Sequence, residues 1–268
     1  MAQPLPSTSL HPMPLTSLPR AVLTDVDDTL TWEGRLPVRA LEALYRLHDA
    51  GVAVIPITGA CAGWCDQMAR TWPVAAVIGE NGAFVIERHG RQMRYHDTHD
   101  EATRLTHRSR LAKVADAVMR QTPGLAPARD NVYRRYDLAL DHAQDVPPLA
   151  EAEVRRALAA ARDLGVQATA SSIHINLWLG DFSKRLAAER WLSESLRLQG
   201  EAARAQVVFV GDSLNDAQMF EAWPRSVGVA NIQRHLASLP RPPAHITQAP
   251  GGLGFAEWVD ELLGAAPC

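Results

Sequence analysis

Short apolar segments that each stop at a polar residue or a glycine are the feature that most limits how this chain can fold. Three of them follow one another early in the sequence, and the stretches between them carry apolar side chains at helical spacing. Strands without polar alternation are buried on both faces, and parallel neighbours need helical connections. The sequence therefore predicts an α/β fold with a doubly covered parallel sheet, whose first strands lie at 21–25, 52–57 and 75–78.

This pattern is interrupted in the middle of the chain and resumes later. Alternation of apolar and polar residues from Ile173 to Leu177 is typical of an antiparallel, half-buried strand. The elements predicted for the middle part are a hairpin at 84–95, helices at 101–120 and 149–164, and strands at 132–140, 166–170 and 173–179. We therefore expect a core domain at 20–83 plus 184–264, with an α+β module inserted at 84–183.

The amino terminus differs from the rest of the chain. Residues 1–19 contain five prolines and no Lys, Arg, Asp or Glu. The prolines interrupt any continuous apolar stretch, so this segment does not resemble a secretory signal. We predict a disordered tail at 1–19 that lies outside the fold.

Composition excludes several classes of protein. The net charge is -3 and no run of Lys or Arg stands out, which argues against a nucleic-acid partner. No apolar stretch approaches the roughly 20 residues that a membrane span requires. Three cysteines, Cys61, Cys65 and Cys268, make no disulfide framework and favour reduced thiols in a cytoplasmic protein.

Polar residues gather at the ends of the predicted core strands. Because the carboxyl ends of parallel strands form one edge, these residues should meet in a single crevice. Several carboxylates so close would repel one another unless a cation lay among them, and oxygen ligands with open water positions suit Mg²⁺. The residues concerned are Asp25, Asp27, Thr58, Lys184, Asp212 and Asp216.

Their order and spacing resemble the haloacid dehalogenase-like phosphohydrolases. Four motifs carry the resemblance: Asp25-Val26-Asp27-Asp28-Thr29-Leu30, Ile57-Thr58-Gly59, Lys184, and Gly211-Asp212-Ser213-Leu214-Asn215-Asp216. The resemblance implies a Rossmannoid core with an inserted C2-type cap. The segment Glu80-Asn81-Gly82-Ala83 resembles the entry to the cap in the Cof branch of this family. That branch includes sucrose-phosphate, trehalose-phosphate and mannosyl-phosphoglycerate phosphatases. Ala60 departs from this branch, where arginine often follows the Thr-Gly pair.

The resemblance also implies a role for each motif residue. Asp25 would attack phosphorus and Asp27 would act as general acid and base. Phosphoryl oxygens would be bound by Thr58, Gly59 and Lys184, with help from Asn215. The ligands of Mg²⁺ would be Asp25, the carbonyl of Asp27, and Asp212, with Asp216 supporting the metal through water or orienting Lys184.

Residues of the predicted cap would read the leaving group. His174 and Asn176 lie two apart on one strand and therefore share a face. Arg134 or Arg135 could reach a second anionic group of the substrate. Trp32 and Trp64 flank the first two motifs and could stack on a sugar ring, although core packing explains both equally well.

Alternatives to this interpretation remain open. Gly211-Asp212-Ser213-Leu214 spells a GDSL esterase signature, but the Asp-x-x-His pair of that family does not follow it. A response-regulator receiver would lack the large insert. The predicted activity is hydrolysis of a small phosphorylated metabolite, a sugar or glycosyl phosphate, by a monomer or homodimer. The rivals are a phosphotransferase or phosphomutase on the same fold, and a catalytically silent binding or regulatory protein.

Overall fold

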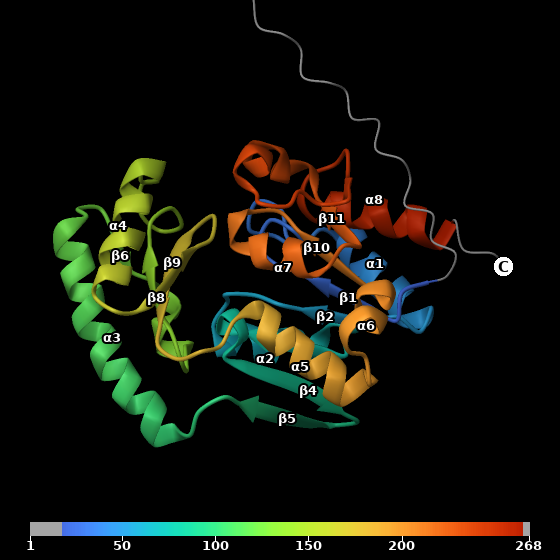
Figure 1. Ribbon diagram of the computed structural model, residues 1–268, viewed down its shortest axis with the longest axis horizontal. Helices are drawn as coiled ribbons and strands as arrows, with labels where there is room; N and C mark the ends of the chain where they lie inside the picture. Colours follow the sequence, from blue (N-terminus) through green and yellow to red (C-terminus); the bar gives the residue numbers. More distant parts are fainter. Residues whose placement is uncertain (1–17, 265–268) are drawn as a thin grey trace, which may run out of the picture.

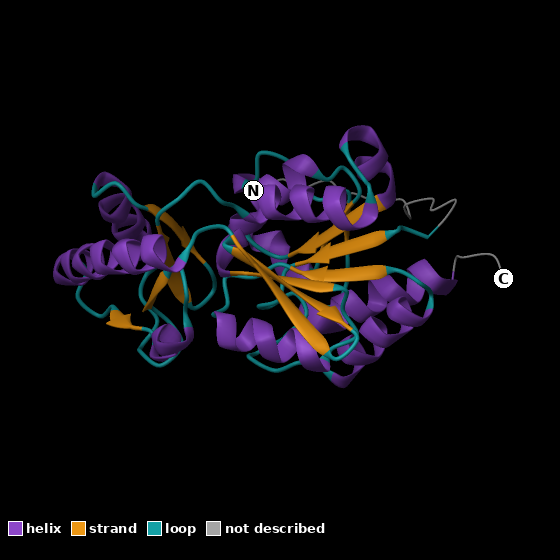
Figure 2. Cartoon of the chain, turned by 90° about the horizontal axis from the view of Figure 1, so that it is seen from below, coloured by secondary structure: helices purple, strands orange, loops and turns teal. Residues whose placement is uncertain are grey.

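A central parallel sheet organises the molecule. The computed structural model describes residues 18–264. Five strands pair in parallel in the order β12-β11-β10-β1-β2, which confirms the predicted α/β class (Figures 1 and 2). These strands are β1 (Ala21–Thr24), β2 (Ala53–Pro56), β10 (Val207–Gly211), β11 (Ser226–Gly228) and β12 (His245–Ile246).

Helices cover both faces of this sheet (Figure 2). Val22 packs in a cluster with residues of α1 (Val38–Asp49) and α8 (Gly251–Gly264). Leu23, the next residue of β1, packs in a second cluster with α5 (Lys184–Leu196). Both faces of the strand are thus buried, which is why it is apolar without alternation. Two shorter helices, α6 (Gly200–Gln206) and α7 (Ala217–Ala222), add to the second cluster.

A hairpin extends the core at the edge next to β2. After α2 (Ala62–Thr71), β3 (Ala76–Gly79) runs parallel to the end of β2 through an Ile57–Ile78 bridge. β4 (Phe84–His89) then pairs antiparallel with β3, and β5 (Gln92–Asp97) pairs with β4.

The predicted boundary at residue 84 therefore differs from the structure. The hairpin belongs to the core because β4 satisfies the hydrogen bonds of β3, and Phe84 and Ile86 join a core cluster.

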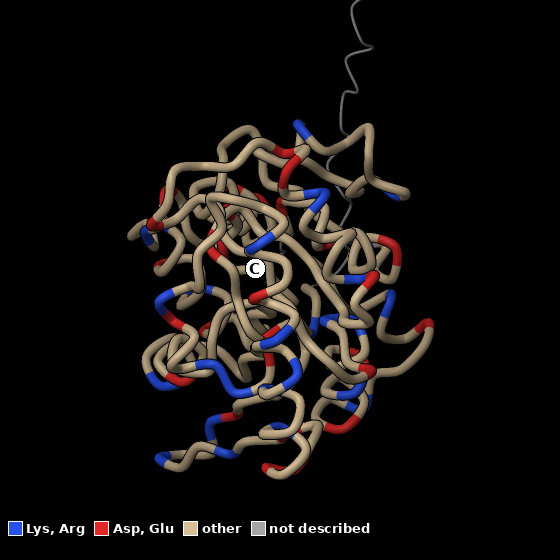
Figure 3. Tube along the Cα trace, turned by 90° about the vertical axis from the view of Figure 1, so that its left-hand side faces the viewer, with Lys and Arg blue, Asp and Glu red and all other residues tan. Residues whose placement is uncertain are grey.

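Residues 99–182, here called the cap, form a separate α+β unit (Figure 1). An antiparallel sheet in the order β6-β7-β9-β8 packs against two helices. The elements are α3 (Glu101–Gln121), β6 (Ala126–Pro127), β7 (Leu138–Asp141), α4 (Glu151–Asp163), β8 (Gln167–Ala170) and β9 (His174–Trp178). Basic and acidic positions intermingle on the side seen in Figure 3, with no continuous basic stripe in the part of the chain described there.

One cap element differs from its prediction. Residues 132–140 were expected to form a strand, but the chain makes a 3-10 helix at Arg129–Tyr133 and becomes β7 only at Leu138. The amide of Asn131 explains this, because it bonds both the N–H and the carbonyl of Ala139 as a neighbouring strand would.

Strand β9 has both faces buried. Ile175 and Leu177 point into the cap's own apolar cluster. His174 and Asn176, on the other face, line a cavity between the cap and the core. The alternation of apolar and polar residues predicted a half-buried strand. In the structure the apolar face packs inside the cap, and the polar face is covered by the core.

The two connections between cap and core touch each other. Gly180 has a φ of +113°, and a Cβ added there would lie 2.5 Å from Cε1 of His99. The N–H of His99 donates to the Tyr136 hydroxyl at 3.1 Å. The chain therefore enters and leaves the cap at one place.

Other expectations concern the ends of the chain and its thiols. Most of the predicted tail lies outside the described residues, whereas Leu18 packs against the core. Cys61 and Cys65 are free and buried. No helix between residues 18 and 264 is long and apolar enough to cross a membrane.

Candidate active site

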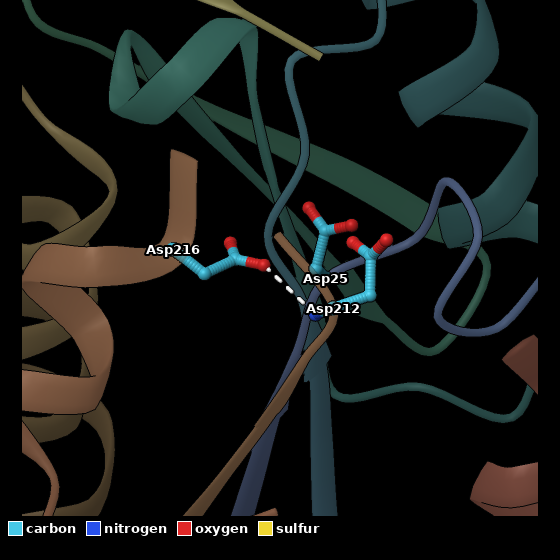
Figure 4. A group of neighbouring side chains, drawn as sticks. All are labelled: Asp25, Asp212 and Asp216. Atoms are coloured by element: carbon cyan, nitrogen blue, oxygen red, sulfur yellow. Dashed lines mark hydrogen bonds between the residues drawn. The ribbon is translucent and has the colours of Figure 1, made fainter. Parts of the chain in front are cut away.

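Three aspartates meet where β1 and β10 end. Asp25 follows β1, and Asp212 and Asp216 follow β10. Each offers a carboxylate oxygen within 4.8 Å of the others, and all three residues are buried. Figure 4 shows the carboxylates of Asp25 and Asp212 side by side, with Asp216 approaching from the left. The structure thus brings together acids that the sequence separates by almost two hundred residues.

Asp216 is already fully engaged. One of its carboxylate oxygens accepts from Lys184 Nζ at 2.9 Å, and the other accepts from the backbone N–H of Asp212 at 3.2 Å (Figure 4). These contacts fit the predicted role of Asp216 in orienting Lys184, and its support of a metal ion stays a prediction. Asp25 and Asp212 face each other as a pair of oxygen donors, and Asp216 completes the group of three that could hold a metal ion.

Lys184 is the positive charge of this cluster. It is the first residue of α5. Ser183 caps the amino terminus of this helix, because its side-chain oxygen accepts from the N–H of Leu186. The Lys184 ammonium lies 2.6 Å from an oxygen of Asp25 and 3.4 Å from the side-chain oxygen of Asn215. Although burial opposes its charge, Asp216 and Asp25 raise the pKa of Lys184 above its ordinary value. The lysine is therefore held charged beside Asp25.

One ammonium does not balance three buried carboxylates. Burial, partly offset by Lys184, raises the pKa of Asp25 well above its ordinary value. Burial together with Asp216 raises the pKa of Asp212 to about 8. Hydrogen bonds from Asn231 Nδ2 at 2.8 Å and Thr29 Oγ1 at 3.4 Å fix the Asp212 carboxylate. An oxygen-only donor pair with surplus negative charge fits Mg²⁺.

Asp27 occupies a different environment from Asp25. It lines the cavity between core and cap, and its carboxylate accepts no hydrogen bond from the residues that the structure describes. Burial, followed by the charge of Asp28, raises the pKa of Asp27. A carboxyl group that retains a proton more readily than usual and faces a cavity is suited to proton transfer.

The segment after β2 presents backbone groups to the same place. The hydroxyl of Thr58 is buried and accepts from the N–H of Ala60 at 3.0 Å. Gly59 lies on the cavity wall, where a Cβ would sit 3.3 Å from the Asn81 amide and 3.4 Å from Asn176. Glycine therefore lets the chain pass close to the cap at this position.

A cavity of about 420 Å³ is lined by Asp25, Asp27, Gly59 and Asp212 of the core and extends to the cap, while Thr58 and Lys184 lie behind its wall. Its cap wall includes His174 and Asn176, and its core wall includes Trp64. His174 Nε2 and Asn81 Nδ2 are buried without a hydrogen-bond partner among the described residues. Two polar groups that a ligand could satisfy therefore belong to residues that line this cavity.

Two predicted contacts with the substrate are not supported. Trp32 does not line the cavity and instead packs against Gly251. Arg135 directs its guanidinium to Asp97. Arg134 does line the cavity, but it donates to Asp130, Asp137 and the carbonyl of Gly59, so its charge is already paired.

Two further residues support the site. Asn231 bonds Asp212 and also the backbone carbonyl of Asp28, and it follows the apolar strand β11. The rule that singled out polar residues after strands could have found it. Glu80 is fully buried and accepts from the backbone N–H groups of Arg135, Tyr136 and Asp137 in the cap. Nothing local in the sequence indicates that contact.

The architecture and the four motif positions identify the class of protein: the chain is a haloacid dehalogenase-like phosphatase of subclass IIB. A sequence model described as Sucrose-6F-phosphate phosphohydrolase matches residues 18–251, and the chain belongs to that family. Proteins of this family act on phosphorylated small molecules. The resemblance read from the motifs is thus confirmed.

Individual relatives carry other names. The phosphoglycolate phosphatase of Pyrobaculum neutrophilum is 33% identical, over 93% of this chain and 98% of its own length. That of Methanothermobacter thermautotrophicus is 31% identical, over 91% and 99%.

Solved structures share the fold at lower identity. A Thermoplasma acidophilum protein superposes with a TM-score of 0.71 at 16% identity, covering 92% of this chain and 99% of its own. The sucrose-phosphatase of Synechocystis, solved with sucrose and phosphate, gives 0.64 at 18% identity, covering 92% and 98%.

Proposed function

We propose that the protein is a Mg²⁺-dependent phosphomonoester hydrolase that works through an aspartyl phosphate on Asp25. The observation that carries this proposal is the buried contact of Lys184 with Asp25, beside Asp212 and next to the cavity between core and cap. The Lys184 ammonium favours the ionised, nucleophilic form of Asp25 against the effect of burial.

Each chain group has a defined task in this proposal. An oxygen of Asp25 forms a bond to phosphorus while the bond from phosphorus to the leaving oxygen breaks. Asp27 donates its proton to that leaving oxygen, and later takes a proton from the water that hydrolyses the aspartyl phosphate. Lys184, the Thr58 hydroxyl and the segment at Gly59 bind the phosphoryl oxygens.

Metal binding fits the same groups. We propose that Asp25, the Asp27 carbonyl and Asp212 hold Mg²⁺. When bound, the ion neutralises charge on the phosphoryl group. Asn231 and Thr29 fix the direction of the Asp212 carboxylate, which is the usual function of groups behind a metal ligand.

For the substrate, we propose a sugar or glycosyl phosphate. Hydroxyl and amide side chains dominate the cap wall of the cavity, and the only cavity-lining arginine among the described residues is already paired with aspartates. A neutral leaving group with several hydroxyls suits such a wall. Besides Asp130 and Arg134, the polar cap residues are Gln144, Thr169, Ser171, Ser172, His174 and Asn176.

Phosphoglycolate is the second candidate. The names of relatives that are 33% and 31% identical over nearly the whole chain favour it. Its carboxylate would need a cation or hydrogen-bond donors at the cap, and the unpartnered His174 Nε2 is the available group.

Phosphate release from a panel of phosphorylated metabolites tests these proposals. Sugar phosphates, glycosyl phosphates and 2-phosphoglycolate are compared by kcat/KM with Mg²⁺, with and without an acceptor alcohol. Free phosphate in the absence of an acceptor supports hydrolysis, whereas transfer without release would make the protein a phosphotransferase or mutase. Tight binding without turnover would favour the silent binding protein. The cytoplasmic location and the monomeric or dimeric state stay predictions.

Asp27→Asn should lower kcat by at least ~10²-fold, the scale for removing a general acid and base. The amide cannot deliver or accept the proton, while Asp25 remains able to attack. Activated esters, whose leaving groups need no proton, should lose less in the first step. Asp28→Asn is the matched control and should lose far less. A full-rate Asp27→Asn enzyme would remove Asp27 from the mechanism.

A further inference from the structure

A cap arginine contacts the backbone of the predicted phosphate-binding segment. Nη1 of Arg134 donates to the carbonyl oxygen of Gly59 at 2.9 Å. That carbonyl belongs to the same peptide group as the N–H of Ala60. The Ala60 N–H donates to the hydroxyl oxygen of Thr58 at 3.0 Å. A single rigid peptide plane therefore links Arg134 of the cap to the Thr58 side chain of the core.

This link sets the direction of the Thr58 proton. Because the Thr58 oxygen accepts from Ala60, its own O–H points elsewhere and can donate to another acceptor, which in the proposed function is a phosphoryl oxygen. A rotation of the peptide between Gly59 and Ala60 would release the hydroxyl from this arrangement. The contacts that fix the carbonyl of Gly59 therefore also fix the orientation of the Thr58 hydroxyl.

Arg134 is itself fixed in place. Its side chain is 1% exposed, and its guanidinium is clamped by Asp130 and Asp137. Asn176 adds a second cap donor to the Gly59 carbonyl at 3.4 Å, and also donates to Asp137 at 2.7 Å. The four cap side chains form one buried network that ends on a single core oxygen.

The segment next to Arg134 is attached to the core by Glu80. The Glu80 carboxylate accepts from the N–H groups of Arg135, Tyr136 and Asp137, and from that of Ala62 at the start of α2. These bonds place Arg134 over Gly59 when the cap lies against the core.

We propose that Arg134 is a positioning residue, which orients the Thr58 hydroxyl through the Gly59–Ala60 peptide and so completes the phosphate-binding site only when the cap is docked. The proposal rests on the proposed function, because it assigns Arg134 to the transferring phosphoryl group. It differs from the expectation that Arg134 binds a second anionic group of the substrate.

Arg134→Lys tests the proposal with acetyl phosphate, a substrate that carries no anionic group besides its phosphate until acetate departs. Lysine keeps the charge but cannot bond Asp130, Asp137 and Gly59 together. We expect kcat to fall on the order of 10²-fold, the scale for misplacing a reacting group by about 1 Å, with a smaller change in KM. Arg135→Lys is the matched control, because that side chain contacts Asp97, and it should keep wild-type kcat.

A double-mutant cycle with Thr58→Val separates positioning from a general structural role. If Arg134 acts through the Thr58 hydroxyl, Arg134→Lys should cost little in the Thr58→Val background, whereas independent effects would multiply. Multiplying effects, or unchanged acetyl phosphate turnover in Arg134→Lys, would overturn the proposal. If Arg134→Lys does not fold, as judged by thermal unfolding, Asn176→Ala decides in the same cycle, with a smaller loss expected.

Failure of the proposed function would be visible separately. Wild-type turnover that disappears in Asp25→Asn supports hydrolysis whatever Arg134→Lys does. Additive losses in an active enzyme would overturn the role of Arg134 alone. A wild-type protein without turnover of acetyl phosphate or any metabolite would overturn both.

Discussion

Asp25→Asn is expected to abolish phosphate release, with a loss on the order of 10⁶-fold, as for removal of a catalytic nucleophile elsewhere. The amide has nearly the same size and cannot attack phosphorus. Because burial raises the pKa of Asp25, the ionised carboxylate is costly in the folded protein, and its removal should not lower the melting temperature. Steady-state phosphate release and thermal unfolding measure the two effects.

The control for this variant is Asp49→Asn. Asp49 is the exposed last residue of α1 and does not belong to the group of buried aspartates. It should keep wild-type activity. Incubation with substrate followed by intact-mass measurement should detect a phosphoryl adduct in wild type, in rapidly quenched samples, and none in Asp25→Asn. Turnover retained by Asp25→Asn, with the substitution verified by mass, would exclude Asp25 as nucleophile.

Removal of Mg²⁺ is expected to have the second large effect. EDTA should silence the enzyme and added Mg²⁺ should restore it, because Asp25 and Asp212 would otherwise repel the phosphoryl group. Mg²⁺ should also raise the melting temperature, since an ion that binds only the folded state stabilises it by about 1.4 kcal/mol per tenfold excess over its Kd.

This stabilisation should depend on pH. The pKa of Asp212 is about 8 in the folded protein, against an ordinary value of 3.8. The metal-free folded state therefore binds this proton more tightly than the unfolded state, and its stability falls as pH rises from 3.8 to about 8. Mg²⁺ binds the ionised carboxylate, so its stabilising effect should grow over the same window.

Comparison with and without Mg²⁺ isolates the metal site. Burial also raises the pKa of Glu80 to about 8, but Glu80 contributes equally in both conditions. Melting temperatures at pH 6 and pH 8 give the difference. In Asp212→Asn, Mg²⁺ should stabilise little at either pH. Full activity in the metal-free enzyme, or a Mg²⁺ effect that Asp212→Asn retains, would refute the site.

The core and the acids of the site were predictable because their signals are local. Val22 and Leu23 are adjacent apolar residues on opposite faces of one strand, which only a doubly covered sheet accommodates. Asp25 and Asp212 each follow such a strand directly, and parallel topology then brings the strand ends together.

Features that depend on distant partners were not predictable. Hairpin β4–β5 has the pattern of any exposed hairpin, and only the free edge of β3 decides that it joins the core. Glu80 resembles an ordinary loop acid until the backbone N–H groups of Tyr136 and Asp137 surround it. Arg134 has the composition of a substrate-binding group, but aspartates three and four residues away pair with it first.

The contact of His99 with Gly180 limits how the cap can move. Because both connections cross between cap and core at one point, we expect any opening of the cap to be a rotation about that point. Any such swing that opens the cavity would pull Arg134 away from the Gly59 carbonyl. With the cap open, solvent and ligands would enter freely, but the phosphate-binding groups would not yet be correctly positioned.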